Sequence, residues 1–323
     1  MTVFNRPGII DEAAEASLAL KRKIFRRDLK KPGLFLLFEL ILYAAVLYVG
    51  MQGISLLVII MCSILIKAYE NNPGADVFLG LGVANFNTIT SLFFNIAPTI
   101  VFLVYGRVFQ GRKLRTQGFV RKNALKHYLI GLAAGAGLFF LALLICLAAG
   151  SVRLAPSESF SITAIILTFL GYIIQGNAEE VMCRGHFMVS VSRRYPVWLG
   201  VALNSILFAC LHLGNPGFGV LPFINILLFG FAMSLLFLRT GNIWMVSAVH
   251  TAWNFVQGCV FGVLVSGIDT GDSILSVASD TSKSLINGGS FGLEGGLAVT
   301  AVYVIGIIVL LFIKPCKDVI SDK

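Results

Sequence analysis

The sequence has few charged residues. Only 13% of its 323 residues are charged and 57% are hydrophobic, with a mean hydropathy of +0.87, whereas a soluble domain carries about 25% charged residues. This composition excludes an ordinary soluble globular protein. We therefore expect an all-α fold, a polytopic membrane protein whose partner is the lipid bilayer.

Several kinds of motif are also missing. The six cysteines form no CxxC pair, which argues against a disulfide framework or a thiolate metal site. There is no HExxH segment of the kind found in zinc proteases. No aromatic-interleaved basic patch accompanies the net charge of +9, so the basic excess indicates topology and contact with lipid, not binding of nucleic acid.

Apolar runs predict about eight transmembrane helices, each long enough for the roughly 17 to 25 residues that a crossing needs. Residues 1–33 are expected to form a cytoplasmic basic amphipathic arm, helical over 11–31, and residues 34–323 one helical membrane domain. The loop 266–294, rich in Gly, Ser and Asp, is expected to be external and flexible. The predicted spans are 34–66, 87–105, 128–149, 160–194, 197–213, 220–238, 243–265 and 295–313.

The third predicted span contains three closely spaced glycines, Gly131, Gly135 and Gly137. Small residues at such spacing let two membrane helices approach closely. We expect all three to contribute to helix packing.

The distribution of Lys and Arg predicts the topology. With eight spans, all but three of the 25 basic residues fall on one side of the bilayer, the exceptions being Lys67, Arg153 and Lys283. Cytoplasmic loops carry the excess of Lys and Arg. Both termini are therefore expected in the cytoplasm, and the protein in the plasma membrane.

A few ionisable residues interrupt the apolar spans, where such residues are costly and indicate a functional site. Glu179 and Glu180 lie in the fourth span, His212 in the fifth and His250 in the seventh. The fourth and fifth spans form a hairpin that turns near Pro196. Glu180 and His212 are equally far from that turn, so they lie at the same height. We expect one site in the cytoplasmic half of the bilayer.

Helical spacing predicts partners for these residues. Asn254 follows His250 by four residues and shares its helix face. Arg184 follows Glu180 by four residues and can pair with it, whereas Glu179 points about 100° away and is freer to face a cavity. Each feature alone is typical of structural packing, but their joint occurrence favours a catalytic site.

Three motifs occur in order on these helices: Glu179-Glu180-x-x-x-Arg184, Phe208-x-x-x-His212 and His250-x-x-x-Asn254. Together they resemble the signature motifs of the CPBP family, the CAAX-prenyl-protease and bacteriocin-processing (Abi) intramembrane proteases. The resemblance covers residues 125–265. It implies a membrane-embedded endopeptidase whose site opens to the cytoplasm and whose substrate is a protein or peptide.

The resemblance also implies roles for single residues. Glu179 and His212 would activate the attacking water, and His250 and Asn254 would hold the oxyanion of the tetrahedral intermediate. A carboxylate in an apolar wall can take a proton from water and later give it to the leaving amine. The supporting residues would be Glu180, Arg184 and Phe208.

The sequence leaves alternatives open for both the cofactor and the function. No metal ligand is assigned and a metal-free, glutamate-dependent hydrolase is favoured, but the family has been called metalloendopeptidases, and zinc could be held by Glu179, His212 and His250. A non-catalytic immunity or regulatory membrane protein of the same fold is one alternative. A proton-coupled transporter is another, since intramembrane Glu and His suit proton relays.

Overall fold

The structure is a computed structural model that describes residue 4, residues 8–25, isolated positions between 41 and 67, and residues 81–314. Most of the predicted first span, 34–66, and nearly all of the C-terminal tail lie outside the described residues. Helix α1 (Gly8–Phe25) confirms a helix in the arm. It begins at Gly8, three residues before the predicted start at 11, and residues 26–31 lie outside the described residues.

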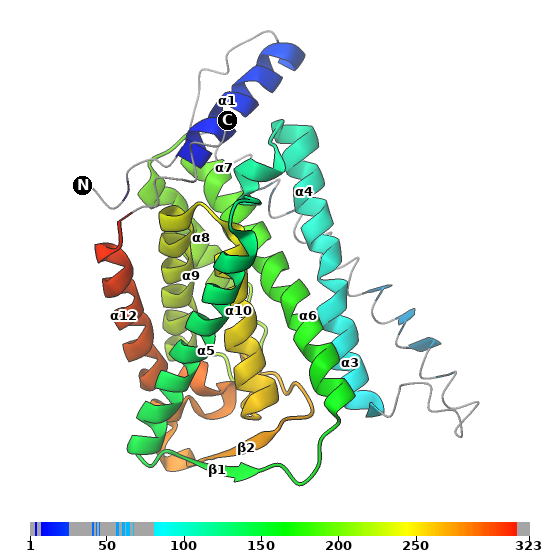
Figure 1. The fold of residues 1–323 in the computed structure, drawn as a ribbon, viewed down its shortest axis with the longest axis vertical. Coiled ribbons are helices and arrows are strands. Elements are labelled where there is room, and N and C mark those ends of the chain that lie inside the picture. Colours follow the sequence, from blue (N-terminus) through cyan, green and yellow to red (C-terminus); the bar gives the residue numbers. More distant parts are fainter. Residues whose placement is uncertain are drawn as a thin grey trace.

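Helices make up most of residues 81–314 (Figure 1). Two of them end in π-helical turns, which are named η2 (Val181–Met188) and η3 (Val256–Val260). A short 3₁₀ turn, η1 (Leu114–Gln117), follows α4. The main helices are α3 (Gly82–Phe94), α4 (Ile96–Gln110), α5 (Ala124–Ala148), α6 (Ile162–Glu180), α7 (Val189–Ser192), α8 (Val197–Cys210), α9 (Val220–Thr240), α10 (Ile243–Phe255) and α12 (Leu297–Phe312).

The described helices confirm the prediction of a helical membrane protein. Four of the described stretches are long and apolar enough to cross a membrane, and α8 and α12 are shorter apolar helices. The seventh predicted span ends with η3 at Val260, not at 265. Eight spans and cytoplasmic termini stay predictions. The four long stretches are Ala84–Gln110, Ala124–Ala148, Ile162–Ser192 and Val220–Thr240.

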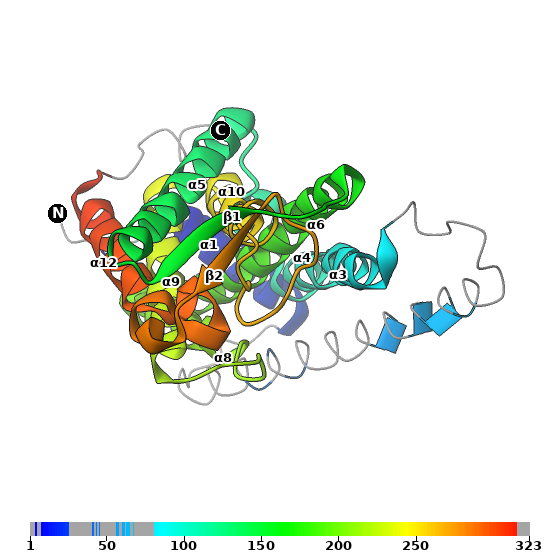
Figure 2. The same ribbon diagram turned by 90° about the horizontal axis from the view of Figure 1, so that it is seen from below.

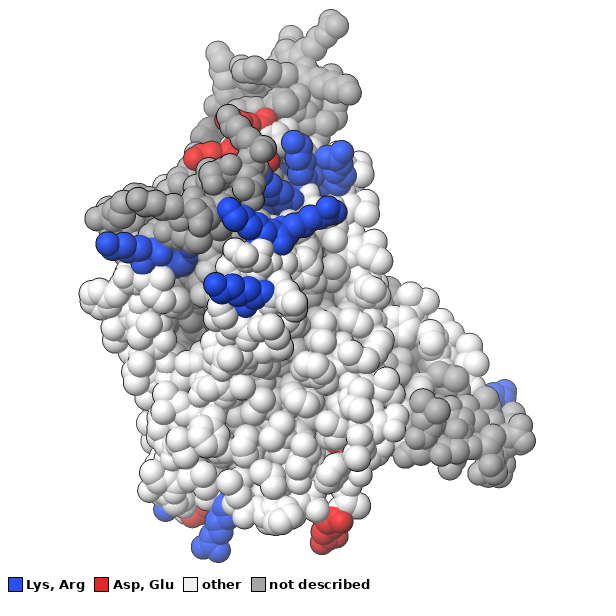
Figure 3. Space-filling view, in the orientation of Figure 1, with Lys and Arg blue, Asp and Glu red and all other residues white. Residues whose placement is uncertain are grey.

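The surface charges are arranged as in an integral membrane protein. Figure 3 shows Lys and Arg gathered at the end of the molecule where α1 lies, an almost uncharged band beyond it, and a few charges at the end where β1 and β2 lie. Large apolar side chains on the band's helices are exposed, among them Ile100, Phe140, Ile166 and Ile305. Such a continuous apolar surface fits contact with lipid.

The segment 266–294 differs from the flexible loop that the sequence predicts, and it adds a small sheet to the predicted all-α fold. Strand β2 (Leu275–Ser279) pairs antiparallel with β1 (Val152–Pro156). The side chain of Asn287 donates hydrogen bonds to the carbonyl oxygens of Ser151 and Asp280. Polar residues in this segment therefore bind backbone groups and hold it in place. Its other elements are η4 (Thr281–Lys283), α11 (Ser284–Asn287), η5 (Gly289–Phe291) and η6 (Leu293–Gly295).

Helix α10 lies between α5 and α6, as the view from the sheet end shows (Figure 2). Glycines on both neighbours allow this. A Cβ on Gly131 would lie 2.5 Å from the carbonyl oxygen of Met245, and one on Gly135 would lie 2.3 Å from that of Val249. On α6, a Cβ on Gly176 would lie 2.8 Å from the hydroxyl of Thr251. The glycines thus bring the polar residues of α6 and α10 close together.

Two of the three glycines predicted to pack do so. Gly137 is the exception, because an added Cβ there meets no atom of the described residues within 4 Å. It follows Gly135 by two residues, so it points about 200° away around the helix.

We expect Gly135→Ala to lower the free energy of unfolding by about 1–3 kcal/mol, because the new methyl group meets a backbone carbonyl of α10 that cannot swing aside. Gly137→Ala is the matched control, and it should be neutral or stabilising by up to about 1 kcal/mol, since Ala favours helix more than Gly does. Thermal unfolding of the detergent-purified protein measures both. Equal stability of the two variants would contradict the close approach of α5 and α10.

Candidate active site

A cavity of about 340 Å³ brings together all four residues that the sequence predicts as catalytic. Glu179 reaches it from α6, His212 from the turn after α8, and His250 and Asn254 from α10. Glu179 and His212 line one cavity, which agrees with the equal heights that the hairpin geometry predicts for the carboxylates and His212.

The cavity wall includes residues from outside the 125–265 segment. Thr88 and Ser91 of α3 and the following Asn95 form part of it, so the second predicted span contributes polar groups. Ser266 and Glu294 extend the wall into the chain that follows α10. The position of the site in the cytoplasmic half of the bilayer stays a prediction.

Glu179 lines this cavity. Its Oε1 accepts a hydrogen bond from Nε2 of Gln175, one turn earlier on α6. Its Oε2 lies 3.7 Å from Nε2 of His250 and has no hydrogen-bond partner among the described residues. The side chain is 20% exposed. A carboxylate oxygen that lacks a donor is costly, and a water molecule or a protonated His250 would supply one.

Glu180 has a different environment. It and Arg184 are both 0% exposed, and Nη1 of Arg184 donates to Oε1 of Glu180 at 2.9 Å. The same oxygen accepts a hydrogen bond from Nδ1 of His250 at 3.0 Å. The division that helical spacing predicted is therefore present: Glu180 pairs with Arg184, and Glu179 faces the cavity. Because Nδ1 of His250 carries this bond, Nε2 is the nitrogen turned toward Glu179.

His212 is oriented by the turn in which it lies. Its Nδ1 donates to the carbonyl oxygen of Phe208 at 2.9 Å, which leaves the lone pair of Nε2 free to accept a hydrogen bond. The Phe208 ring lies 5.0 Å from the His212 ring and packs under the Arg184 guanidinium, 4.4 Å from its Cζ. Phe208 thus contacts both a predicted catalytic residue and a predicted supporting one.

Gln175, which was not among the predicted site residues, links two that were. Its Nε2 donates to Glu179, and its Oε1 accepts from Nδ2 of Asn254 at 3.1 Å. The second hydrogen of Nδ2 of Asn254 stays available for a ligand. The four-residue spacing from Gln175 to Glu179 is the signal that could have identified it.

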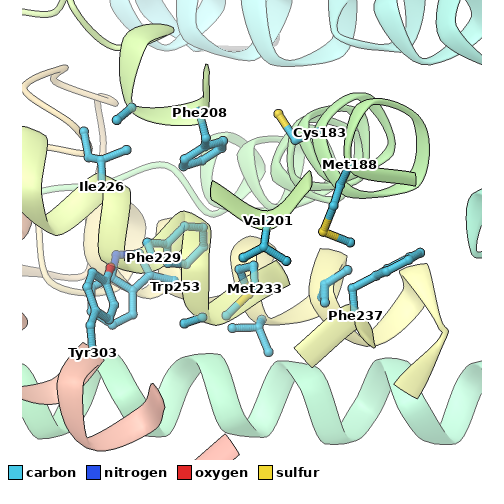
Figure 4. Close-up of a cluster of buried hydrophobic side chains, with 14 of the residues drawn as sticks. Cys183, Met188, Val201, Phe208, Ile226, Phe229, Met233, Phe237, Trp253 and Tyr303 are labelled. Atoms are coloured by element: carbon cyan, nitrogen blue, oxygen red, sulfur yellow. The ribbon is translucent and has the colours of Figure 1, made fainter. Parts of the chain in front are cut away.

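Glu294 is a second residue that was missed. Its Oε1 accepts from Nε1 of Trp253 at 2.9 Å, and its Oε2 accepts from the backbone N–H and the hydroxyl of Ser266 at 2.6 and 2.8 Å. Figure 4 shows Trp253 beside Phe229 and Tyr303, which also line the cavity. Glu294 therefore fixes the wall next to Asn254.

Both helices that carry the site leave α-helical geometry beside it. Segment η2 begins directly after Glu180, and η3 begins two residues after Asn254. Insertions of this kind are frequent at functional sites.

The favoured metal-free hydrolase, and the alternative of zinc held by Glu179, His212 and His250, both stay predictions. Within the described ranges, no three His, Cys, Asp or Glu side chains are placed to hold a metal ion. Both ring nitrogens of His250 face carboxylates, and Nδ1 of His212 is bound to a carbonyl oxygen. The mechanism proposed below uses only side chains of the described residues and a water molecule.

Residues 161–256 match the family model described as type II CAAX prenyl endopeptidase, Rce1-like. The match runs from the N-cap of α6 to the end of α10 and contains all three motifs. It confirms the resemblance to the CAAX-protease family that the motifs indicated. A search of curated proteins finds no match to the chain.

Proposed function

We propose that this protein, whose segment 161–256 is similar to the Rce1-like CAAX prenyl endopeptidases, is an intramembrane endopeptidase that cleaves a membrane-associated protein or peptide. The family match supports a protease. The observation that carries the mechanism is the Glu179 side chain, 20% exposed, on a cavity wall that it shares with His212, His250 and Asn254.

In the first step, a water molecule held between Glu179 and His212 attacks the carbonyl carbon of the scissile bond. Glu179 takes one proton from the water, and Nε2 of His212 accepts a hydrogen bond from the other. The C–O bond forms while the carbonyl electrons move onto oxygen. Asn254 Nδ2 and a protonated His250 Nε2 donate to this oxyanion, and preorganised donors are most effective in a cavity with little water.

In the second step, Glu179 gives its proton to the amide nitrogen, and the C–N bond breaks as the carbonyl forms again. The products are a carboxyl terminus and an amine, and Glu179 returns to its carboxylate form. Glu180 and Arg184 do not touch the substrate in this scheme. They hold His250 in orientation through Nδ1.

The volume of the cavity limits the size of the substrate segment that can bind in it. At about 340 Å³ it lies at the small end of the roughly 300–1,000 Å³ that ligand pockets span. It can take a short extended segment around the scissile bond, not a folded domain. A prenylated C-terminal peptide, the substrate class that the family description names, has this form.

The substrate class can be tested with the purified protein in detergent. A farnesylated CAAX peptide, the same peptide without the farnesyl group, and a peptide from a transmembrane segment would be incubated with it and the products identified by mass spectrometry. Cleavage of the farnesylated peptide alone assigns prenylated substrates. Cleavage of the transmembrane peptide alone would reject prenylated substrates. The protein would then be a general intramembrane protease.

We expect Gln175→Leu to lower kcat by up to about 100-fold with little change in KM, because Glu179 and Asn254 lose the side chain that orients both, and small displacements at a reacting centre have effects of this size. Ser91→Ala is the matched control. Ser91 also lines the cavity, but its hydroxyl donates to the carbonyl oxygen of Thr88. Steady-state kinetics separates the two variants, and a wild-type kcat for Gln175→Leu would refute the positioning role.

A further inference from the structure

A second hollow, of about 840 Å³, is lined mainly by basic residues. It is formed by the last turn of α4, the segment 112–122 and the start of α10, at the end of the molecule where Figure 3 shows Lys and Arg gathered. None of the described residues that line it is acidic. The basic ones are Arg107, Arg112, Lys113, Arg115, Arg121 and Lys122.

Buried contacts give this basic groove a defined wall. Arg112 is fully buried, and its guanidinium donates to the carbonyl oxygens of Gly185 and His186 at 2.7 and 3.2 Å. Nε1 of Trp244 donates to the carbonyl oxygen of Val120 at 3.0 Å. The segment 112–122 is therefore fixed to η2 on one side and to α10 on the other.

Three cations at the rim have no counter-charge among the described residues. Arg115 forms an ion pair of 3.6 Å with Glu12 of α1. Arg107, Lys113 and Arg121 are exposed and have no acidic partner among the described residues. Like charges gathered in a groove attract an anion strongly.

Exposed apolar side chains border these cations. Val108 and Phe109, on the last turn of α4, are 56% and 69% exposed, and Leu114 is 56% exposed. Trp244 is the second residue of α10, and Trp is enriched where membrane helices meet the headgroup region. The groove therefore combines a site for an anion with an adjoining surface for hydrocarbon.

We propose that the basic groove binds the headgroup of an anionic phospholipid. The phosphate lies among Arg107, Lys113 and Arg121, and the acyl chains follow the exposed apolar side of α4. A soluble phosphate would satisfy the cations alone and leave Val108 and Phe109 uncovered. This site is separate from the catalytic cavity and does not depend on the proposed function.

The test is the melting temperature of the detergent-purified protein with added phosphatidylglycerol, phosphatidylcholine or inorganic phosphate. We expect phosphatidylglycerol to raise it by about 3 °C or more, because a ligand that binds only the folded state stabilises it. The other two additives should have no such effect. An equal shift with inorganic phosphate, or no shift with phosphatidylglycerol, overturns the proposal.

Two sets of substitutions show which residues cause the rise in melting temperature with phosphatidylglycerol. The groove variant Arg107→Gln/Lys113→Gln/Arg121→Gln should lose the shift. The control variant removes the same charge from exposed residues outside the groove and should keep it; it is Lys126→Gln/Arg153→Gln/Lys314→Gln. Native mass spectrometry gives a second readout: wild type should retain phosphatidylglycerol that the groove variant releases. Equal loss in both variants would mean general charge attraction and would overturn a specific site.

Discussion

Glu179→Gln is expected to reduce peptide cleavage by about 100- to 10,000-fold, the range that general acid–base catalysis contributes. Gln has nearly the same shape and can still accept the hydrogen bond from Gln175. It cannot take a proton from water or return one to the leaving amine. The variant should therefore fold normally and bind substrate, and the loss should be in kcat.

The measurement is steady-state cleavage by purified wild type and variant, with melting temperatures recorded for both. Glu158→Gln is the control, because Glu158 is an exposed acid between β1 and α6 that does not line the cavity. A Glu179→Gln protein that cleaves at the wild-type rate would remove Glu179 from the mechanism. Full loss accompanied by a much lower melting temperature would point instead to a structural role.

The second large effect is on stability. Arg184→Met should lower the free energy of unfolding by about 3–5 kcal/mol, because it leaves the Glu180 carboxylate buried without its cation. Both side chains are 0% exposed, so water cannot replace the lost partner. His250 also bonds to Glu180, and its orientation in the site should suffer as well.

A double variant separates the ion pair from simple packing. Replacing both partners of a buried pair is often close to neutral, so Glu180→Gln/Arg184→Met should be more stable than Arg184→Met alone. Chemical unfolding in detergent micelles measures both proteins. If the double variant is the less stable of the two, the destabilisation comes from lost packing around Phe208 and not from an unpaired charge.

The parts of the site that the sequence predicted are those set by local helical spacing. Glu180 and Arg184 are four residues apart on one chain segment, and the structure pairs them. His250 and Asn254, also four apart, line the same cavity. Such contacts depend only on helix geometry, which a sequence pattern carries.

The missed features depend on contacts between distant segments. The hydrogen bond from Trp253 to Glu294 joins residues 41 positions apart. No periodic pattern in the sequence predicts such a contact. Strands β1 and β2 are short and come from separate loops. Gln175 could have been predicted as a site residue, because it lies one turn before Glu179. A polar residue in a span has many possible partners, however, until the position of a neighbouring helix is known. Because Asn254 packs against α6 in the structure, it is the partner of Gln175.

The two alternatives drawn from the sequence lead to different experimental outcomes. An immunity or regulatory protein would keep its cellular effect after Glu179→Gln, because the cluster would serve only as polar packing. A proton-coupled transporter would show ligand-dependent flux in proteoliposomes. The proposed endopeptidase should lose its cellular effect in the Glu179→Gln variant. It should show no ligand-dependent flux in proteoliposomes.

The central claim is that the cavity around Glu179 hydrolyses peptide bonds in membrane-associated proteins. Its most direct test compares the protein termini in membranes of cells that produce wild type or Glu179→Gln at equal levels. The proposal predicts a set of new termini in membrane-associated proteins that appear only with wild type. Identical termini in the two membranes would contradict it.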